Sequence, residues 1–167
     1  MRQFFPGKSP LLWSCLLLAC TPAVGTTQAQ WPQAPSRLNF STPYGNLGVA
    51  NSDYVYESTL RIDNIDITPE IKGLLNITYA FAMPKAQAAL VSISDGNNRC
   101  PISYRWVILH SKGYEVSPAF GSCSRQIKVT VAGTKFTLET PNNQKPDKID
   151  IYVYDGKTVK QRTIHPK

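Results

Sequence analysis

Hydrophobic and polar residues alternate along most of the chain from about Leu38 onward, a pattern that predicts strands rather than helices. Turn-forming residues separate the alternating runs, and Asp155-Gly156 and residues 132–134 are typical of tight hairpins. The runs with this pattern are residues 54–62, 89–94, 103–110, 126–131, 135–140, 149–154 and 158–164. We therefore predict a mostly β, single-domain antiparallel sheet, arranged as a meander, a sandwich-like fold or an open curved sheet, with at most one short helix and one disulfide.

One segment, residues 68–79, supports two predictions. Thr68 suits a helix N-cap and Pro69 suits the first helical position, so a short helix can begin here. Gly73 interrupts that helix, however, and residues 76–81 alternate as a strand does. The pattern favours a turn at Thr68-Pro69 followed by a strand, and the helix remains the alternative.

Residues 1–20 have the features of an export signal peptide. Arg2 and Lys8 give it a positive start, and residues 11–18 form an apolar run that is too short to span a bilayer. The last four residues of the signal peptide, residues 17–20 (Leu-Leu-Ala-Cys), resemble a bacterial lipobox, in which Cys20 would carry a lipid anchor. The alternative is ordinary signal-peptidase cleavage near Gly25 or Ala29, which would discard Cys20.

Composition changes twice after the leader. Residues 21–37 are rich in Thr, Pro, Gln and Ala with almost no charge, as in a flexible tether. Residues 38–167 carry the alternating pattern and form the predicted β domain. Removing the leader leaves roughly 140 residues, which is enough for one domain to bury most of its apolar surface without a metal.

Two of the four cysteines, Cys100 and Cys123, lie beyond the leader. In an oxidising compartment they would form a disulfide, and closing a loop of about 24 residues would stabilise the fold by about 3 kcal/mol. A redox-active pair or a zinc site is the alternative, but the chain has no Cys-x-x-Cys and only His110 and His165 could join a metal site. We therefore predict a structural disulfide.

Three short motifs are spaced along the second half of the chain. They are CPISYR at residues 100–105, FGSCS at residues 120–124 and YVYDGK at residues 152–157. Together they resemble a pattern in small exported proteobacterial envelope proteins of unassigned activity. The resemblance spans roughly residues 89–160, and it implies export, a disulfide and β architecture but no catalytic site.

The sequence offers little enzyme chemistry. It has no glycine-rich phosphate loop, no Gly-x-Ser-x-Gly and no His-Glu-x-x-His motif. Asp63, Asp66 and Glu70 are the nearest approach to a carboxylate cluster, and their surroundings favour turn and solvent positions. We therefore predict a protein that is not an enzyme and binds no cofactor or metal.

Charge points weakly towards an acidic partner. The whole chain has a net charge of +7, and without Arg2 and Lys8 the net charge is +5 (16 minus 11). This excess favours an acidic protein, anionic lipids or surface polymers, whereas no basic-aromatic motif indicates nucleic acid. The alternative is that Lys157, Lys160 and Arg162 protect an edge strand from pairing with other chains.

Aromatic residues supply the candidate contact surface. Trp106 shares strand parity with Tyr104 and Ile108, which predicts one core-facing row. Residues 114–120 form a predicted loop that the disulfide would order, so that the loop would lose little entropy on binding. The candidate contact residues are Tyr114, Glu115, Pro118, Phe120 and Arg105.

These observations favour an exported envelope binding protein. The leading hypothesis is an inhibitor or immunity-type module that binds another protein in the periplasm. The alternative is a structural or assembly lipoprotein, which would associate with cell-wall or outer-membrane components. Size, export, a disulfide-ordered loop and missing catalytic motifs carry the leading hypothesis.

Overall fold

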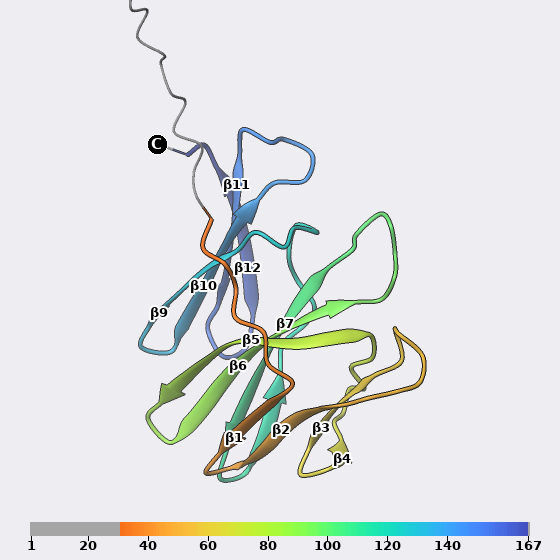
Figure 1. Ribbon diagram of the computed structural model, residues 1–167. Helices are drawn as coiled ribbons and strands as arrows, with labels where there is room; N and C mark the ends of the chain where they lie inside the picture. The colour runs from red at the N-terminus through yellow and green to blue at the C-terminus, as the bar shows by residue number, and fades with distance from the viewer. Residues whose placement is uncertain (1–30, 167) are drawn as a thin grey trace, which may run out of the picture. The chain divides into compact units, whose positions relative to one another are not determined.

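The structure, a computed structural model, describes residues 31–166, in which twelve strands form three antiparallel sheets and no helix occurs (Figure 1). The mostly β prediction is therefore confirmed. The predicted signal peptide, Cys20 and the cleavage positions near Gly25 and Ala29 lie outside the described residues. No helix that could cross a membrane is found within the described range.

The central sheet has the strand order β5-β6-β7-β8, and each outer sheet also has four strands. The first outer sheet has the order β1-β2-β3-β4, and the second has the order β12-β11-β10-β9. The central sheet contains β5 (Leu74–Met83), β6 (Ala86–Ser94), β7 (Ser103–His110) and β8 (Gly113–Val116). The first outer sheet contains β1 (Asn39–Thr42), β2 (Gly45–Ala50), β3 (Thr59–Ile62) and β4 (Ile65–Asp66). The second outer sheet contains β9 (Lys128–Ala132), β10 (Lys135–Pro141), β11 (Ile149–Tyr154) and β12 (Val159–Ile164).

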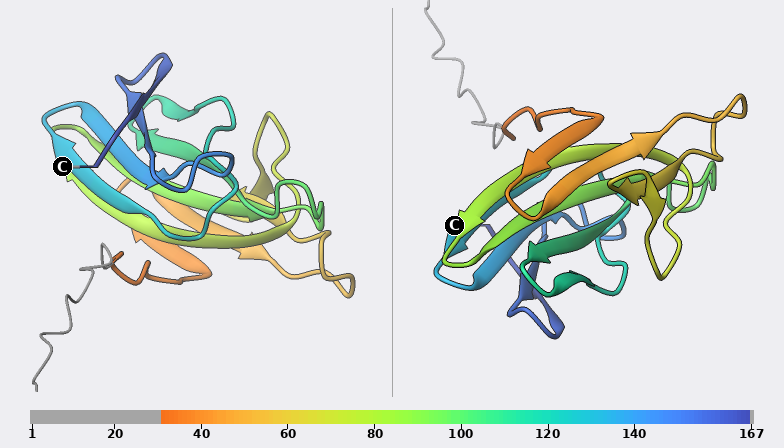
Figure 2. Two further views of the ribbon diagram at one scale, coloured as in Figure 1. Left: turned by 90° about the horizontal axis from the view of Figure 1, so that it is seen from above. Right: turned by 90° about the horizontal axis from the view of Figure 1, so that it is seen from below.

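Both faces of the central sheet are covered, one by each outer sheet (Figure 2). In β7, Trp106 and Ile108 point to one core, whereas Val107 and Leu109 point to the other. A strand that is buried on both faces needs apolar residues at successive positions, because alternate side chains point to opposite sides. This explains the continuous apolar run from Trp106 to Leu109.

The core shared with the second outer sheet is rich in aromatic residues, and we call it the aromatic core. The predicted row of Tyr104, Trp106 and Ile108 is confirmed as part of it. Trp106 packs against Phe136 at a centroid distance of 4.6 Å. Its buried members are Ala88, Leu90, Tyr104, Trp106, Ile108, Phe120, Ile127, Phe136, Leu138, Tyr152 and Tyr154.

The core shared with the first outer sheet has no aromatic residue among its buried members, and we call it the aliphatic core. These members are Leu47, Leu60, Ile67, Ile71, Leu75, Ile77, Ala89, Val91, Val107 and Leu109. Ile67 and Ile71 flank the bend at Thr68 and Pro69, so this bend is held by buried side chains at both ends. The helix that the sequence left open over residues 68–79 does not form, and the bend leads into β5.

A β-bulge at Thr78 lets β5 contribute to both cores in succession. The pairing register with β6 shifts between Ile77 and Tyr79. Ile77 therefore belongs to the aliphatic core, whereas Tyr79 and Phe81 pack against the aromatic core. The buried Thr78 hydroxyl donates a hydrogen bond to the Leu90 carbonyl at 3.0 Å. A bulge that re-aims side chains in this way keeps each face of the strand apolar where it is covered.

The strand predictions hold for most of the second half of the chain and are wrong at one place in the first half. The predicted strand over residues 54–62 begins only at Thr59, and residues 54–57 lie in the loop between β2 and β3. The hairpins around residues 132–134 and Asp155-Gly156 are confirmed, since they join β9 to β10 and β11 to β12. The β12 strand lies at the edge of its sheet.

The predicted tether over residues 21–37 enters the described range at Trp31. Its last residues contact the β domain: Arg37 and Ile77 exchange backbone hydrogen bonds of 3.1 and 2.9 Å, and the Ser36 hydroxyl donates to Asn76 at 2.7 Å. Ala34 packs against the aromatic core. Residues 34–37 are thus attached to the folded domain and do not act as a free spacer.

Candidate functional site

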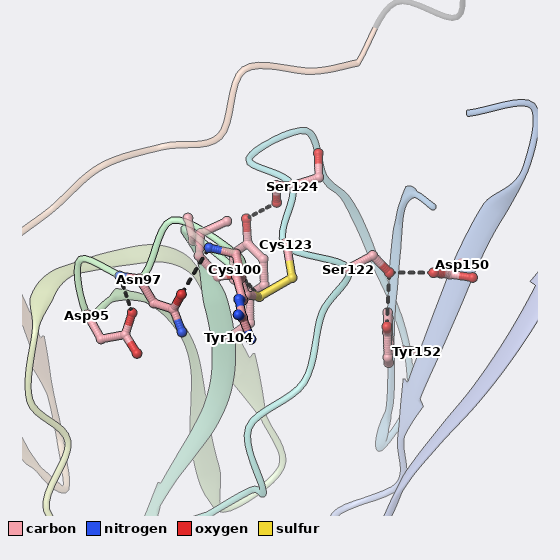
Figure 3. The surroundings of a disulfide bond; sticks show 11 residues. Asp95, Asn97, Cys100, Tyr104, Ser122, Cys123, Ser124, Asp150 and Tyr152 are labelled. Atoms are coloured by element: carbon pink, nitrogen blue, oxygen red, sulfur yellow. Dashed lines mark hydrogen bonds between the residues drawn. A yellow bond between two sulfur atoms is a disulfide. The ribbon is translucent and has the colours of Figure 1, made fainter. Parts of the chain in front are cut away.

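The predicted disulfide between Cys100 and Cys123 is present, with a Cα–Cα distance of 4.6 Å (Figure 3). It joins the connection before β7 to the segment between β8 and β9. That segment is held at two further points, because Phe120 exchanges backbone hydrogen bonds with Tyr104 and the Tyr104 hydroxyl donates to the Ser124 carbonyl at 2.8 Å. The disulfide therefore braces a segment that is already attached to the central sheet.

Next to the disulfide lies a buried polar cluster centred on Asp150 of β11 (Figure 3). Asp150 accepts hydrogen bonds from the hydroxyls of Ser122 and Thr163, and from the side-chain amide of Asn142 at 3.0 and 2.9 Å. The Ser122 hydroxyl also lies 2.9 Å from the Tyr152 hydroxyl. The cluster thus ties residue 122, adjacent to Cys123, to two strands of the second outer sheet.

The hydrogen bonds fix the charge of Asp150. Burial raises the pKa of this carboxyl, but the hydrogen bonds from Ser122, Thr163, Asn142 and Gln161 together outweigh burial and hold the pKa below its usual value. The carboxylate is therefore ionised at neutral pH and fully engaged by donors. Such a group positions neighbouring segments, because it has neither the raised pKa nor the free lone pair that proton transfer requires.

Shifted pKa values at four further side chains also follow from burial or from hydrogen bonding. Burial raises the pKa values of Tyr104, Tyr152 and Tyr154, so these hydroxyls stay protonated. A hydrogen bond from Arg61 lowers the pKa of the Asp66 carboxyl. Residues 31–166 contain no group of three or more His, Cys, Asp or Glu side chains that could hold a metal ion. The hydrogen bonds of Asp150, Tyr104 and Asp66 therefore join neighbouring segments of the fold.

The predicted contact residues do not form one surface. Tyr114 lies in β8 and packs against the aliphatic core, with its hydroxyl accepting the Thr68 N–H at 2.7 Å. Phe120 is only 9% exposed and belongs to the aromatic core, on the other face of the central sheet. The predicted loop over residues 114–120 is thus wrong in its first part, which is a strand, and its two aromatic rings pack against different cores.

The remaining candidates have separate roles. Glu115 and Pro118 are exposed. The Arg105 guanidinium donates to the Ser117 carbonyl at 3.1 Å, so Arg105 braces the chain after β8. Their use in binding stays a prediction, and it no longer includes Phe120.

A different segment presents exposed apolar residues together. Tyr54, Val55 and Tyr56 are 70%, 64% and 47% exposed, and they lie in the connection of residues 51–58, which we call the β2–β3 loop. The sequence predicts a strand here because aromatic and β-branched residues favour strands. The signal that would have identified a loop is the polar, turn-forming stretch at residues 51–53.

The β2–β3 loop is held by local hydrogen bonds and by one packing contact. The Tyr54 N–H donates to the Ser52 hydroxyl at 3.2 Å, and the Glu57 N–H donates to the Tyr54 carbonyl at 3.1 Å. The ring of Tyr56 packs on Gly96, where a Cβ atom would lie 3.0 Å from the ring. Because Gly96 belongs to the connection that carries Cys100, the loop rests on the disulfide-braced region.

Comparison with protein-family models, with curated proteins and with solved structures found no match for this chain. The fold and the site themselves define a three-layered antiparallel β protein with one braced side and one exposed aromatic loop.

Proposed function

We propose that this protein is an exported envelope binding protein that engages another protein, in the manner of an inhibitor or immunity-type module, through the β2–β3 loop. The observation that carries the proposal is the exposure of Tyr54, Val55 and Tyr56 side by side on one anchored loop. Aromatic residues, tyrosine above all, supply much of the binding energy at protein interfaces, because a large rigid ring loses little conformational entropy.

Three further observations support the proposal. The contact between Tyr56 and Gly96 and the turn bond from Glu57 to Tyr54 order the loop before binding, which lowers the entropic cost of association. The disulfide suits an oxidising compartment such as the periplasm. The net charge of +5 that remains without Arg2 and Lys8 (16 minus 11) favours a partner with an acidic surface.

The test places a photo-crosslinking amino acid at position 54 of the full chain in its native host. The matched control carries the same probe at Ile164, an apolar residue of β12 that is 38% exposed and belongs to the other outer sheet. We expect one defined protein adduct from the position 54 probe and none from the position 164 probe, with the adduct identified by mass spectrometry.

The adduct is then purified as a complex, and its affinity is measured by calorimetry. Tyr54→Ser should weaken binding at least tenfold, since truncating an aromatic anchor commonly costs more than 1.4 kcal/mol. Ile164→Ser should leave the affinity unchanged. Identical adducts from the two probes, or a complex that is indifferent to Tyr54→Ser, would overturn the proposal.

A further inference from the structure

The outward face of the first outer sheet carries an open groove of about 440 Å³. The groove follows β2 across the register Asn39–Gly48–Arg61, where β1, β2 and β3 lie side by side. It lies on the face opposite to Leu47 and Leu60, which point into the aliphatic core. Its polar lining consists of Asn39, Asn46, Asn51, Arg61, Asp63 and Asn64.

The floor of the groove exists because residue 48 has no side chain. Gly48 lies in the interior of β2 without a positive φ, so the backbone there would accept any residue. A Cβ atom at this position would lie 2.9 Å from the side-chain oxygen of Asn39. Glycine inside a strand weakens the strand and often marks a place where another molecule approaches the backbone closely. We call this feature the Gly48 groove.

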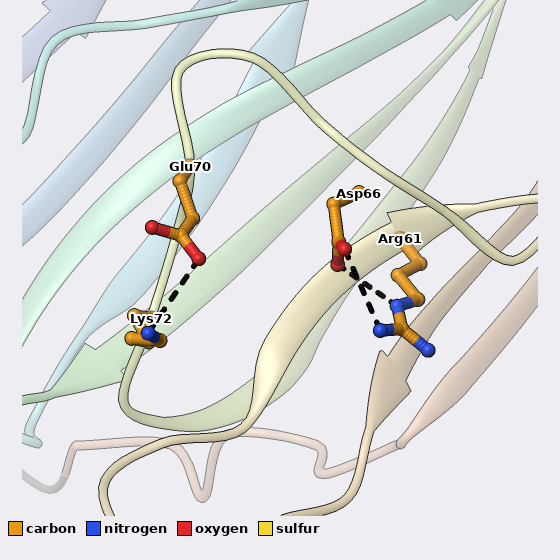
Figure 4. A network of polar contacts seen from close by, with 4 residues as sticks. All are labelled: Arg61, Asp66, Glu70 and Lys72. Atoms are coloured by element: carbon orange, nitrogen blue, oxygen red, sulfur yellow. Dashed lines mark hydrogen bonds and ion pairs between the residues drawn. The ribbon is translucent and has the colours of Figure 1, made fainter.

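The positive charge in the groove lining is already paired with a carboxylate. The Arg61 guanidinium forms hydrogen bonds of 2.8 and 3.4 Å with the carboxylate of Asp66 (Figure 4). The Asp63 carboxylate accepts the backbone N–H of Asn46 at 2.8 Å. An Arg that is already paired is a poor site for phosphate or a polyanion, which need an uncompensated positive charge.

The remaining polar groups are four side-chain amides, from Asn39, Asn46, Asn51 and Asn64. Each amide offers both a donor and an acceptor, and a hydroxyl group likewise donates and accepts. Neighbouring hydroxyls on a sugar ring therefore match this lining, whereas an apolar ligand would leave it unsatisfied. Strand β2, from Gly45 to Ala50, spans about 17 Å, which is room for a short oligosaccharide.

We infer that the Gly48 groove binds a neutral, hydroxyl-rich oligosaccharide. The volume lies within the range of small-molecule sites, about 300–1,000 Å³. The inference does not depend on the proposed protein-binding function, because it rests on the strand face of β1–β3 and not on Tyr54 or Tyr56. A saccharide site next to an aromatic loop would let one side of the molecule contact both a glycan and a protein.

The test measures chemical-shift changes in the full chain on addition of cellotriose, maltotriose and chitotriose, with tri-galacturonate as an acidic probe. We expect at least one neutral trisaccharide to bind with a Kd near 1 mM or tighter. The amide signals that move should be those of residues 39, 46, 48 and 61. The acidic probe should move none of them.

The decisive variant is Gly48→Val, which fills the floor. Val suits a strand, and its Cβ needs only a rotation of the flexible Asn39 side chain, so the variant should melt at the same temperature or higher. We expect its saccharide affinity to fall at least tenfold. The matched control is Ala132→Val, which enlarges an exposed strand position in β9 to the same residue and should bind as the unmodified chain does.

Asn39→Ala is a second variant that removes one amide and leaves the floor open, and we expect it to weaken binding about three- to tenfold. Tyr54→Ser should leave saccharide binding unchanged, so failure here is distinguishable from failure of the proposed protein interface. The inference is overturned by any of three results: no neutral probe binds up to about 10 mM, binding persists in Gly48→Val, or only the acidic probe binds.

Discussion

The two outer sheets cover the same central sheet but differ in how they are held. The β9–β12 sheet contributes Phe136, Tyr152 and Tyr154 to the aromatic core, and Asp150 ties it to the segment that carries Cys123. The buried side chains of the β1–β4 sheet are all aliphatic, and its aromatic residue Phe40 is only partly buried. The comparison teaches that the fully buried rings and the buried carboxylate are concentrated on one side, whereas the other side carries the exposed loop and the groove.

The outward faces of the two outer sheets also differ, in the residues that they expose. On β12, the exposed Lys160 and Arg162 line a sheet edge, where charged side chains discourage pairing with other chains. On β2, the outward face is opened by Gly48 and continues into the exposed Tyr54. One outer sheet therefore presents features that prevent association, and the other presents features that permit it.

The largest expected effect tests the two cores. Trp106→Ala should lower the free energy of unfolding by about 4 kcal/mol, because it removes the largest ring of the aromatic core, and Leu47→Ala in the aliphatic core should cost about 3 kcal/mol. Urea unfolding measures both values. Trp106→Phe provides a milder variant should the alanine variant fail to fold. A loss greater for Leu47→Ala than for Trp106→Ala would contradict the comparison.

Removing the disulfide should have the next largest effect. Replacing Cys100 and Cys123 by Ser in the same chain frees a loop with a sequence separation of 23 residues. We expect the free energy of unfolding to fall by about 3 kcal/mol, chiefly through the larger entropy of the unfolded chain. Thermal unfolding with and without reductant measures the change. The double variant should be insensitive to reductant, and any remaining sensitivity would assign the effect elsewhere.

Asp150→Asn should cost about 2 kcal/mol at neutral pH, because an amide cannot accept all the hydrogen bonds that the carboxylate receives. The folded pKa of Asp150 lies below its unfolded value, so its contribution is present above about pH 4 and is lost as the pH falls through the folded pKa. Urea unfolding between neutral and strongly acidic pH measures this loss.

The Asp150→Asn variant should therefore lose less stability on acidification than the unmodified chain does. The control is Asp53→Asn, at an exposed carboxylate of the β2–β3 loop, which should lose as much stability on acidification as the unmodified chain does. Parallel pH profiles for the unmodified chain and Asp150→Asn would show that the buried carboxylate has no part in acid stability.

The smallest expected effect on folding belongs to the proposed interface. Tyr54→Ser should change the free energy of unfolding by less than about 0.5 kcal/mol, because this side chain is 70% exposed. The same variant should weaken the partner complex at least tenfold, as stated above. A large loss of stability would mean that Tyr54 supports the fold, and would exclude this residue from the proposed interface.

Short-range patterns made much of the second half of the chain predictable. Strand β7 and the hairpin of β11 and β12 follow from runs of β-favouring residues that end at recognised turn residues such as Asp155-Gly156. The Cys100–Cys123 disulfide was equally predictable, because these are the only two cysteines beyond the predicted leader. In each case the information lies within a few residues or in a simple count.

What the sequence could not provide depends on which strands become neighbours. Tyr54 and Val55 have strand propensity but find no partner strand, so they stay in a loop. Tyr114, which begins the predicted loop over residues 114–120, lies in β8 and pairs with Leu109 of β7. The Gly48 groove needs β1, β2 and β3 in register, and no local pattern specifies that alignment.

The bulge at Thr78 also has a consequence for how the domain unfolds. Because β5 serves the aliphatic core before the bulge and the aromatic core after it, neither core can open without disturbing the same strand. Melting should accordingly be a single cooperative event, and amide protons on either side of the central sheet should exchange with solvent together.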